Sequence, residues 1–191
     1  MFTSTSNADT AEAGAADVLI PLIRTAATIG FAIAPCSLGF VIIAVSEQLI
    51  RSIMVGDDPE MLMSDLQNQF PNDAIELKEH DDAGLLAKVV DLIERPDKAL
   101  ELPLDIRGTD FQMRVWDALQ KVPAGTTVSY TFLAEQIGAP DAVRAVAQAC
   151  AANPLAVAIP CHRALCADGG LSGYRWGSER KRALLEREAK V

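Results

Sequence analysis

The first half of the chain alternates between apolar runs and short polar breaks, a pattern that predicts a sheet accompanied by two helices. Residues 29–36, 39–46 and 49–56 are almost entirely apolar and are separated by a Ser-Leu pair and a Glu-Gln pair. Runs of this length, punctuated by Gly, Pro and Ser, are typical of β-strands. Residues 59–70 and 84–94 instead carry apolar side chains at helical spacing, so we predict two amphipathic helices there.

The first two apolar runs also raise the question of a membrane span. Residues 25–46 contain no charged side chain, and 22 residues are enough to cross a bilayer as a helix. Gly30, Pro35 and Gly39 interrupt this stretch in the way that such residues punctuate strands. We therefore predict two strands here and no membrane segment.

Helical spacing returns in the second half, where three helices are predicted in succession. Residues 109–122 begin with Thr109 and have Gln112 three positions later, which is the pattern of a capping box. Residues 129–138 end in a glycine at the expected C-cap, and residues 141–154 end in an Asn-Pro pair. Two short helices joined by a tight turn resemble a helix-turn-helix, although many helical domains contain such a pair without binding DNA.

The end of the chain predicts a short strand, a turn and a last helix. Residues 156–160 are apolar and predict a strand, and residues 164–174 place two short arms around an Asp-Gly-Gly turn, which favours a β-hairpin wing. We expect the final helix to be capped by Ser178, and Glu188 continues an apolar face that includes Leu184. A carboxylate in that position needs a partner, unless the last turn frays and leaves it in solvent.

The third helix of the second half is unusual in composition. It contains six alanines, and Arg144 is its only basic residue. Alanine is the best helix former, so this composition is typical of a closely packed core helix. The alternative is a surface whose small side chains let the backbone approach a DNA minor groove, with Arg144 left to probe it. The helix alone favours the first interpretation.

Charge is distributed unevenly along the chain. The net charge is −9, which by itself argues against a nucleic-acid partner. Residues 1–104 hold 6 Lys and Arg against 17 Asp and Glu, whereas residues 105–191 hold 11 against 9. The second part is therefore weakly basic, a distribution that permits DNA binding there without requiring it.

Candidate chemistry gathers at Cys161, His162 and Arg163, in a chain with only four cysteines and two histidines. No CxxC pair is present, so we expect no structural zinc site, and only spacing favours a Cys161–Cys166 disulfide. A buried cysteine is usually a small apolar side chain, but a nearby histidine or cation makes it a nucleophile. Adjacent side chains of a strand point to opposite faces, so His162 can assist Cys161 only if Pro160 turns the chain. Both interpretations remain open on chemistry alone.

The sequence around this cysteine closely resembles a known family. IPCHR is similar to the acceptor-cysteine signature of O6-methylguanine-DNA methyltransferases, and PLDIRGTDFQ, VSYTFLA, AVRAVAQACAANPLA and LSGYRWG extend the resemblance. The chain looks most like the methyltransferase half of bacterial Ada-type proteins. The specific motifs lie within residues 102–188, and weaker likeness in CSLGFVIIAV and SIMVGDD widens the resemblance to about residues 30–190.

The resemblance implies an α+β fold in two parts. A small ribonuclease-H-like α/β domain would occupy residues 28–100. A winged-helix-like domain containing the helix-turn-helix would occupy residues 101–191 and carry both DNA binding and the reaction. Residues 1–27, which are small, polar and acidic, would form a mobile tail.

The resemblance also implies a reaction. Such a protein repairs DNA by flipping an O6-alkylated guanine out of the duplex into a pocket, where the cysteine thiolate attacks the alkyl carbon in one displacement. The thioether product is stable, so each molecule would act once, with no cofactor and no metal. The expected partner is double-stranded DNA containing O6-alkylguanine, bound through its minor groove by a monomer in the cytoplasm, with no membrane involved.

Individual roles follow from the positions that match the family's motifs. Cys161 would be the acceptor, His162 would deprotonate it through a water, and Glu188 would orient and stabilise that histidine. Tyr130 would protonate the leaving guanine at N3, and Arg144 would fill the gap left in the base stack. The other matching positions would contact DNA, brace the site or hold the base: Ala145 on the helix in the minor groove, Asn153 bracing the turn before the cysteine, Tyr174 lining the pocket, and Val157, Ala158 and Ser172 contributing main-chain contacts to its wall.

Two departures from the family pattern matter for the function. A branched residue, mostly Val, usually follows PCHR, whereas this chain has Ala164, which indicates looser packing behind His162 or a wider pocket. No cysteine precedes Cys36, so the four-cysteine zinc domain of Ada proteins is not carried over. Neither are phosphotriester repair and transcriptional activation.

Three other functions were weighed against repair by transfer. A non-catalytic alkyltransferase-like protein that binds lesions would lack the acceptor cysteine, which is present here as Cys161. A Cys–His hydrolase of the papain type has its two catalytic residues far apart in sequence, whereas Cys161 and His162 are adjacent here. A plain helix-turn-helix module leaves Tyr130 and Glu188 without a purpose. We therefore expect a single-turnover methyltransferase that acts on DNA, with the lesion-binding protein as the alternative.

Overall fold

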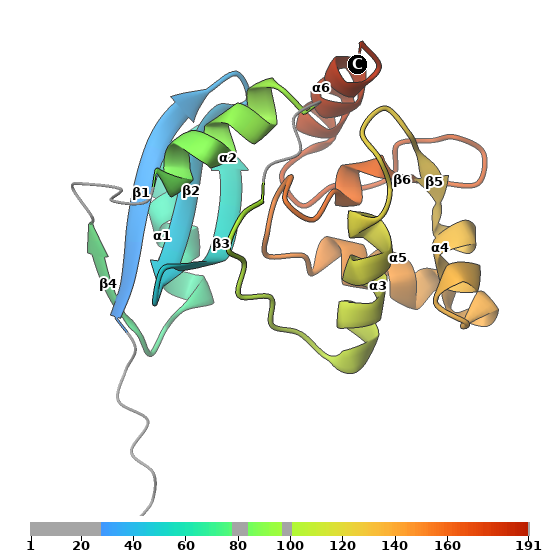
Figure 1. Ribbon diagram of the computed structural model, residues 1–191, viewed down its shortest axis with the longest axis horizontal. Coiled ribbons are helices and arrows are strands. Elements are labelled where there is room, and N and C mark those ends of the chain that lie inside the picture. Colours follow the sequence, from blue (N-terminus) through green and yellow to red (C-terminus); the bar gives the residue numbers. More distant parts are fainter. Residues whose placement is uncertain (1–27, 78–83, 97–100, 191) are drawn as a thin grey trace, which may run out of the picture.

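The computed structural model describes residues 28–77, 84–96 and 101–190. It is a mixed α+β fold in which a sheet with two helices is followed by a mainly helical part (Figure 1). The elements of the first part are β1 (Thr28–Cys36), β2 (Gly39–Ser46), β3 (Leu49–Gly56), α1 (Pro59–Gln69), β4 (Ala74–Leu77) and α2 (Leu85–Glu94). The elements of the second part are α3 (Asp110–Gln120), β5 (Val128–Ser129), α4 (Tyr130–Gln136), α5 (Val143–Ala151), β6 (Ala164–Leu165), α6 (Ser178–Glu188) and the 3₁₀ turns η1 (Pro140–Ala142) and η2 (Cys161–Arg163). The predicted acidic tail, residues 1–27, lies outside the described residues.

The sheet explains the long apolar stretch near the start of the chain. Its strand order is β3-β2-β1-β4, with β4 parallel to β1 and the other pairs antiparallel. Neighbouring side chains of a strand point to opposite faces, and Ile42 and Ile43 of β2 are both buried, so both faces are covered. The helices α1 and α2 provide this cover (Figure 1). The three predicted strands are thus confirmed, and none of the helices within the described ranges has the length and apolar character of a membrane span.

The free edge of the sheet holds the second part of the molecule in place. On β3, the amide of Ile50 donates to the Pro103 carbonyl at 2.7 Å, and the amide of Ile53 donates to the Pro154 carbonyl at 2.9 Å. In return, the amide of Ala156 donates to the Ile53 carbonyl at 3.0 Å. The segment that leads into Cys161 is therefore fixed to the sheet by backbone hydrogen bonds.

The second part is built on α3, which packs against α5 and α4. Trp116 of α3 is buried, and its indole Nε1 donates to the Ala149 carbonyl of α5 at 2.9 Å. The predicted capping box is confirmed. The Thr109 hydroxyl accepts from the Gln112 amide at 3.3 Å, and the Gln112 side chain accepts from the Thr109 amide at 2.9 Å.

Thr109→Ala is expected to lower the free energy of unfolding by about 1 kcal/mol, because it leaves a helix-terminal amide without its acceptor. Urea titration measures this loss. Thr131→Ala is the matched control, since Thr131 is exposed within α4 and alanine is the better helix former there. Equal losses in the two variants would show that the cap contributes nothing.

Two predictions for the second part are wrong. Residues 156–160 do not form a strand: the amide of Ile159 donates to the Leu155 carbonyl at 3.0 Å, so the segment bonds to itself in turns. The hairpin wing is also absent from the described residues, because β6 pairs in parallel with β5. The expected hairpin is replaced by a turn, in which the Cys166 amide donates a hydrogen bond to the Gly170 carbonyl at 2.9 Å. The strand β4 was not predicted, since four residues show too little periodicity.

Candidate active site

Cys161, His162 and Arg163 lie on a tight turn rather than on a strand. Pro160, with φ −79° and ψ 59°, precedes the 3₁₀ turn η2, and the Arg163 amide donates to the Pro160 carbonyl at 3.0 Å. A 3₁₀ turn has three residues per revolution, so consecutive side chains point about 120° apart. This confirms the expected break at Pro160, so Cys161 and His162 are not held on opposite faces of a strand.

The Cys161 sulfur is buried beside an amide donor. The side chain is 3% exposed, and Asn153 Nδ2 donates to Sγ at 3.2 Å. Burial raises the pKa of the Cys161 thiol to about 11, although the Asn153 hydrogen bond and the charge of Lys181 act in the opposite direction. The resting sulfur is therefore a thiol at neutral pH, and a reaction through the thiolate requires removal of its proton.

Asn153 braces the turn in the manner expected from the sequence. Its Oδ1 accepts from the Leu155 amide at 2.8 Å, and its Nδ2 also donates to the Ile159 carbonyl at 2.9 Å. The side chain is fully buried, which favours this bracing role over a direct contact with DNA. Its position favours a role in placing the sulfur.

His162 and Glu188 form a buried pair. The imidazole Nε2 lies 2.8 Å from Glu188 Oε1, and both side chains are almost completely inaccessible. The carboxylate fixes the tautomer with the proton on Nε2, which leaves a lone pair on Nδ1. Within the described residues, Nδ1 is the buried side-chain atom that has no hydrogen-bond partner. Burial lowers the pKa of His162, so its Nδ1 can accept a proton at neutral pH.

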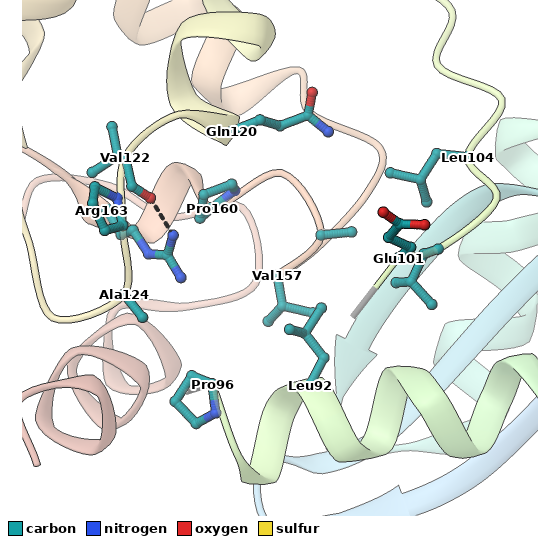
Figure 2. A pocket seen from close by; sticks show the side chains of 13 residues that line it. Leu92, Pro96, Glu101, Leu104, Gln120, Val122, Ala124, Val157, Pro160 and Arg163 are labelled. Atoms are coloured by element: carbon teal, nitrogen blue, oxygen red, sulfur yellow. Dashed lines mark hydrogen bonds between the residues drawn. The ribbon is translucent and has the colours of Figure 1, made fainter. Parts of the chain in front are cut away.

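Arg163 completes this pair, a role that sequence reasoning missed. Its Nε donates to Glu188 Oε2 at 3.0 Å and its Nη2 donates to Glu188 Oε1 at 2.8 Å, in the forked geometry of strong Arg–carboxylate pairs. Its Nη1 donates to the Val122 carbonyl (Figure 2). Burial by itself would raise the pKa of Glu188, but hydrogen bonds from His162 and Arg163, with their charges, hold it at about 2. Glu188 is therefore ionised at neutral pH.

Glu188 is the last residue of the helix α6, which places its carboxylate beside His162 and Arg163. The helix begins at Ser178, but Gly177 is its N-cap, and no side chain caps it. The prediction of a Ser178 cap is therefore wrong, because the chain reverses at Gly177 with φ 98°, a conformation that favours glycine. The predicted partner for a carboxylate on the apolar face of this helix is confirmed, since Glu188 meets both His162 and Arg163.

A cavity of about 470 Å³ opens beside the Cys161 sulfur. Tyr130 lies in its wall and is buried, and its hydroxyl is 2.7 Å from Ser172 Oγ. Burial raises the pKa of Tyr130, so the phenol keeps its proton at neutral pH. The Tyr174 ring lies edge-on to the His162 ring, with centroids 6.4 Å apart. The cavity is lined by Tyr130, Ala147, Cys150, Ala151, Cys161, Cys166, Ser172, Gly173, Tyr174 and Arg175.

A second cavity, of about 650 Å³, lies on the other side of the turn, between α2, the end of α3 and Pro160 (Figure 2). Val157 and Ala158 line this second cavity, together with Leu92 and Arg163. Neither Val157 nor Ala158 is among the residues that line the Cys161 cavity, and the main-chain contacts expected of them stay a prediction. Val157 has a left-handed backbone conformation, with φ 59°.

The surface of α5 presents Arg144 to solvent. Arg144, Gln148 and Ala151 are exposed, whereas Ala145 is half-buried. No hydrogen bond or ion pair found among the described residues engages the Arg144 guanidinium. Ala151 also lines the Cys161 cavity, so this exposed face of α5 borders that cavity.

The thiols around the cavity are not equivalent. Burial raises the pKa of Cys150 to about 12, and Cys150 lacks the amide donor that Asn153 gives to Cys161. All four cysteines are free, so the disulfide that spacing allowed does not form. In the ranges that the structure describes, no group of His, Cys, Asp and Glu side chains is arranged to hold a metal ion.

The chain is similar in sequence to proteins of one known family. The family model described as 6-O-methylguanine DNA methyltransferase, DNA binding domain, matches residues 110–190. The bifunctional transcriptional activator/DNA repair enzyme Ada of Escherichia coli is 51% identical over 164 residues, which cover 83% of this chain and 45% of that protein. A methylated-DNA–protein-cysteine methyltransferase of Mycobacterium bovis is 57% identical over 88 residues, or 46% of this chain and 53% of that protein. The chain thus spans about half the length of the curated relatives that it matches.

Solved structures match over nearly the whole described fold. Mycobacterium tuberculosis OGT in complex with DNA has a TM-score of 0.69 and 33% identity, with 85% of this chain and 93% of that chain covered. The O6-methylguanine-DNA methyltransferase of Pyrococcus kodakaraensis has a TM-score of 0.68 at 24% identity, which shows the fold. Both parts of the molecule, and not only the cysteine motif, are therefore shared with these proteins.

Proposed function

Because the chain belongs to the 6-O-methylguanine DNA methyltransferase family, we propose that it repairs DNA by transferring an alkyl group from guanine O6 in a duplex to its own Cys161. One observation carries this proposal. The Cys161 sulfur opens into a cavity, while its neighbour His162 is oriented by an ionised Glu188 and keeps a free Nδ1. A thiol, a base and an orienting carboxylate are the parts that an activated nucleophile needs.

The transfer is a single displacement. The Cys161 thiol gives its proton to His162 Nδ1 through a water, the sulfur forms a bond to the alkyl carbon, and the bond from that carbon to O6 breaks. The electron pair of the broken bond remains on guanine. The ion pair with Glu188 stabilises the imidazolium that forms. The thioether is stable, so each molecule reacts once.

Tyr130 supplies the proton that the departing guanine needs. The phenol is in the cavity wall and is protonated at neutral pH. Donation to N3 turns an anionic leaving group into neutral guanine, which lowers the barrier to breaking the bond at O6. Ser172, whose hydroxyl is 2.7 Å from the phenol oxygen, holds Tyr130 in this orientation, and Tyr174 closes the pocket over the base.

The exposed face of α5 is the proposed contact with DNA. Its small side chains allow the backbone to approach the minor groove, with Ala145 near the groove and Arg144 inserted into the base stack in place of the flipped guanine. The position of α5 supports this arrangement, because Ala147 and Ala151 of this helix line the same cavity as Cys161.

The finer description of the fold also belongs to this proposal. Residues 28–100 form a ribonuclease-H-like domain and residues 101–191 a winged-helix-like domain, behind an acidic tail at 1–27. The sheet order β3-β2-β1-β4 and the helices α3 to α5 support this division, although β5 and β6 replace the expected wing. We also propose that the protein acts as a monomer in the cytoplasm. Sedimentation with and without DNA tests the oligomeric state.

Arg144→Ala tests the assignment to duplex repair. Loss of the side chain that fills the base stack is expected to slow transfer from a duplex by about 10- to 100-fold, because extrusion of a base costs a few kcal/mol. Transfer from free O6-methylguanine, which is already out of a helix, should change by less than about twofold. Single-turnover rates on the two substrates measure the difference.

Arg182→Ala is the matched control, because Arg182 is an exposed arginine of α6 that pairs with Glu179. It should leave both rates unchanged. Equal losses on duplex and free base in Arg144→Ala would exclude the insertion of Arg144 and, with it, this docking of α5.

A further inference from the structure

A lysine lies buried behind the reactive turn. Lys181 of α6 has a fully inaccessible side chain, and its Nζ donates to the Ala164 carbonyl at 2.7 Å. The same Nζ is 6.0 Å from the centre of the Tyr130 ring. Ala164 directly follows the η2 turn, so this hydrogen bond holds the ammonium next to the turn that carries Cys161.

The ammonium has no acidic partner among the described residues. None of the ion pairs found there includes Lys181, and Glu188, two turns further along α6, is engaged by His162 and Arg163. A buried charge is rarely left without a counter-charge. Burial lowers the pKa of Lys181, and negative charge on Cys161, Cys150 or Cys166 would raise it, so these sulfurs are the nearby groups that can become its counter-charge.

Of the two buried thiols, Cys161 has the better supported anion. Lys181 and the Asn153 amide both lower the pKa of Cys161, whereas Cys150 has the charge of Lys181 without the amide. A nearby ammonium, together with an amide that donates to the sulfur, is an environment that stabilises a thiolate. This combination distinguishes Cys161 from Cys150, the other buried thiol of the cavity.

We propose that Lys181 is the counter-charge of the Cys161 thiolate, a positioning residue that stabilises the anion formed as the thiol proton leaves. The inference rests on the proposed function and adds a second source of activation to it. His162 removes the proton, and Lys181 stabilises the charge that remains on sulfur. Hydrogen bonding to Ala164 holds the ammonium in place while this happens.

Other charged and titratable groups lie close enough to affect the measurement. They come from every element around Lys181: Cys161, His162 and Arg163 from the turn, Cys150 from α5, Cys166 from the loop, Tyr130 from α4, and Tyr174 and Arg175 from the segment before α6. The test must therefore follow the Cys161 sulfur itself.

Lys181→Gln separates the charge of Lys181 from its hydrogen bond, because glutamine retains an N–H donor for the Ala164 carbonyl. The measurement is the rate of Cys161 alkylation by iodoacetamide between about pH 7 and pH 10, read by mass spectrometry of the Cys161 peptide. We expect the pH–rate profile to move about one unit toward higher pH, which makes labelling about tenfold slower at neutral pH. Lys181→Met should give the same displacement, Lys181→Arg should keep most of the wild-type rate, and Lys190→Met, at an exposed lysine near the end of the same helix, should change nothing.

Each outcome bears on the proposal. If the pH–rate profile of Lys181→Gln coincides with that of the wild type, the proposal is overturned. Lys181 would then have only a structural role, through its hydrogen bond to the Ala164 carbonyl. An Arg variant as slow as Met would also overturn the proposal, provided that both unfold at the wild-type temperature. If Gln does not fold, the Met and Arg pair decides in the same way.

The labelling contains no DNA, so it separates this inference from the proposed function. Suppose that the pH–rate profile of Lys181→Gln shifts as expected but the wild-type protein transfers no alkyl group from a lesion duplex. The proposed function would then be rejected, and the effect of Lys181 on the Cys161 thiolate would stand. If wild-type alkyl transfer is normal and the pH–rate profile of Lys181→Gln does not shift, only the role proposed for Lys181 is rejected.

Discussion

Cys161→Ser is expected to abolish alkyl transfer while the protein still binds a duplex containing the lesion. Serine has nearly the same size and can still accept the hydrogen bond from Asn153, which contacts the sulfur at 3.2 Å. Its hydroxyl is a far weaker nucleophile, however, and removing a catalytic nucleophile costs about 10⁵-fold or more in rate. Transfer should fall below detection, and the Kd for lesion duplex should stay within about threefold of wild type.

The matched control is Cys166→Ser, because Cys166 lines the same cavity without the Asn153 contact. It should transfer at close to the wild-type rate. Transfer that persists in Cys161→Ser, or that disappears equally in Cys166→Ser, would contradict the assignment of the acceptor. Loss of lesion binding in Cys161→Ser would show that the sulfur has a structural role beyond chemistry.

Glu188→Gln is expected to reduce both rate and stability. The side chain keeps its shape but loses the charge that meets His162 at 2.8 Å and the forked donors of Arg163. An uncompensated arginine and a histidine that is no longer stabilised as imidazolium should slow transfer by about 10²-fold or more. Removing one partner of a buried ion pair should lower the free energy of unfolding by about 3 kcal/mol at neutral pH.

The sign of the pH dependence follows from the carboxylate. Folding depresses the pKa of Glu188 to about 2, so its contribution to stability is present above the ordinary glutamate value and is lost as pH falls through the folded value. The stability difference between wild type and Glu188→Gln should therefore shrink between about pH 5 and pH 2. Glu186→Gln, at an exposed position of the same helix, is the control and should show no such trend. A difference that is constant over this range would mean that the charge of Glu188 does not stabilise the fold.

The strands and helices of the first part were largely predictable, because their signal is local. In β2, Val41 to Val45 are all buried, and this run is visible in the sequence without any knowledge of the partner strands. The capping box at Thr109 is equally local. The β4 strand was missed because a strand of four residues depends on its pairing with β1, which the sequence does not show.

The errors near the site have a common physical cause. Residues 156–160 have the composition of a strand, but Asn153 and the β3 edge hold the backbone in turns, with Val157 at positive φ. Composition cannot reveal that long-range contacts override local preference.

The site itself was predictable only where a motif carried it. Cys161, His162, Glu188 and Tyr130 were identified through the family resemblance. The structure places Cys161 and Tyr130 in the wall of one cavity and pairs His162 with Glu188. Arg163 and Lys181 were missed because a basic residue in a sequence looks solvated until its partners are known. For Arg163 the available signal was its adjacency to His162 in a turn, which points both side chains toward α6. For Lys181 the sequence contains no signal, because its burial depends on how α6 packs against the cysteine turn.

The most direct test of the account is the intact mass of the protein after incubation with a duplex that contains one O6-methylguanine. We predict a gain of one methyl group in place of one hydrogen, in proportion to the lesion supplied and never more than one per molecule, on the peptide that contains Cys161. An unchanged mass, with the lesion duplex still bound selectively, would contradict transfer and would make the chain a lesion-binding protein.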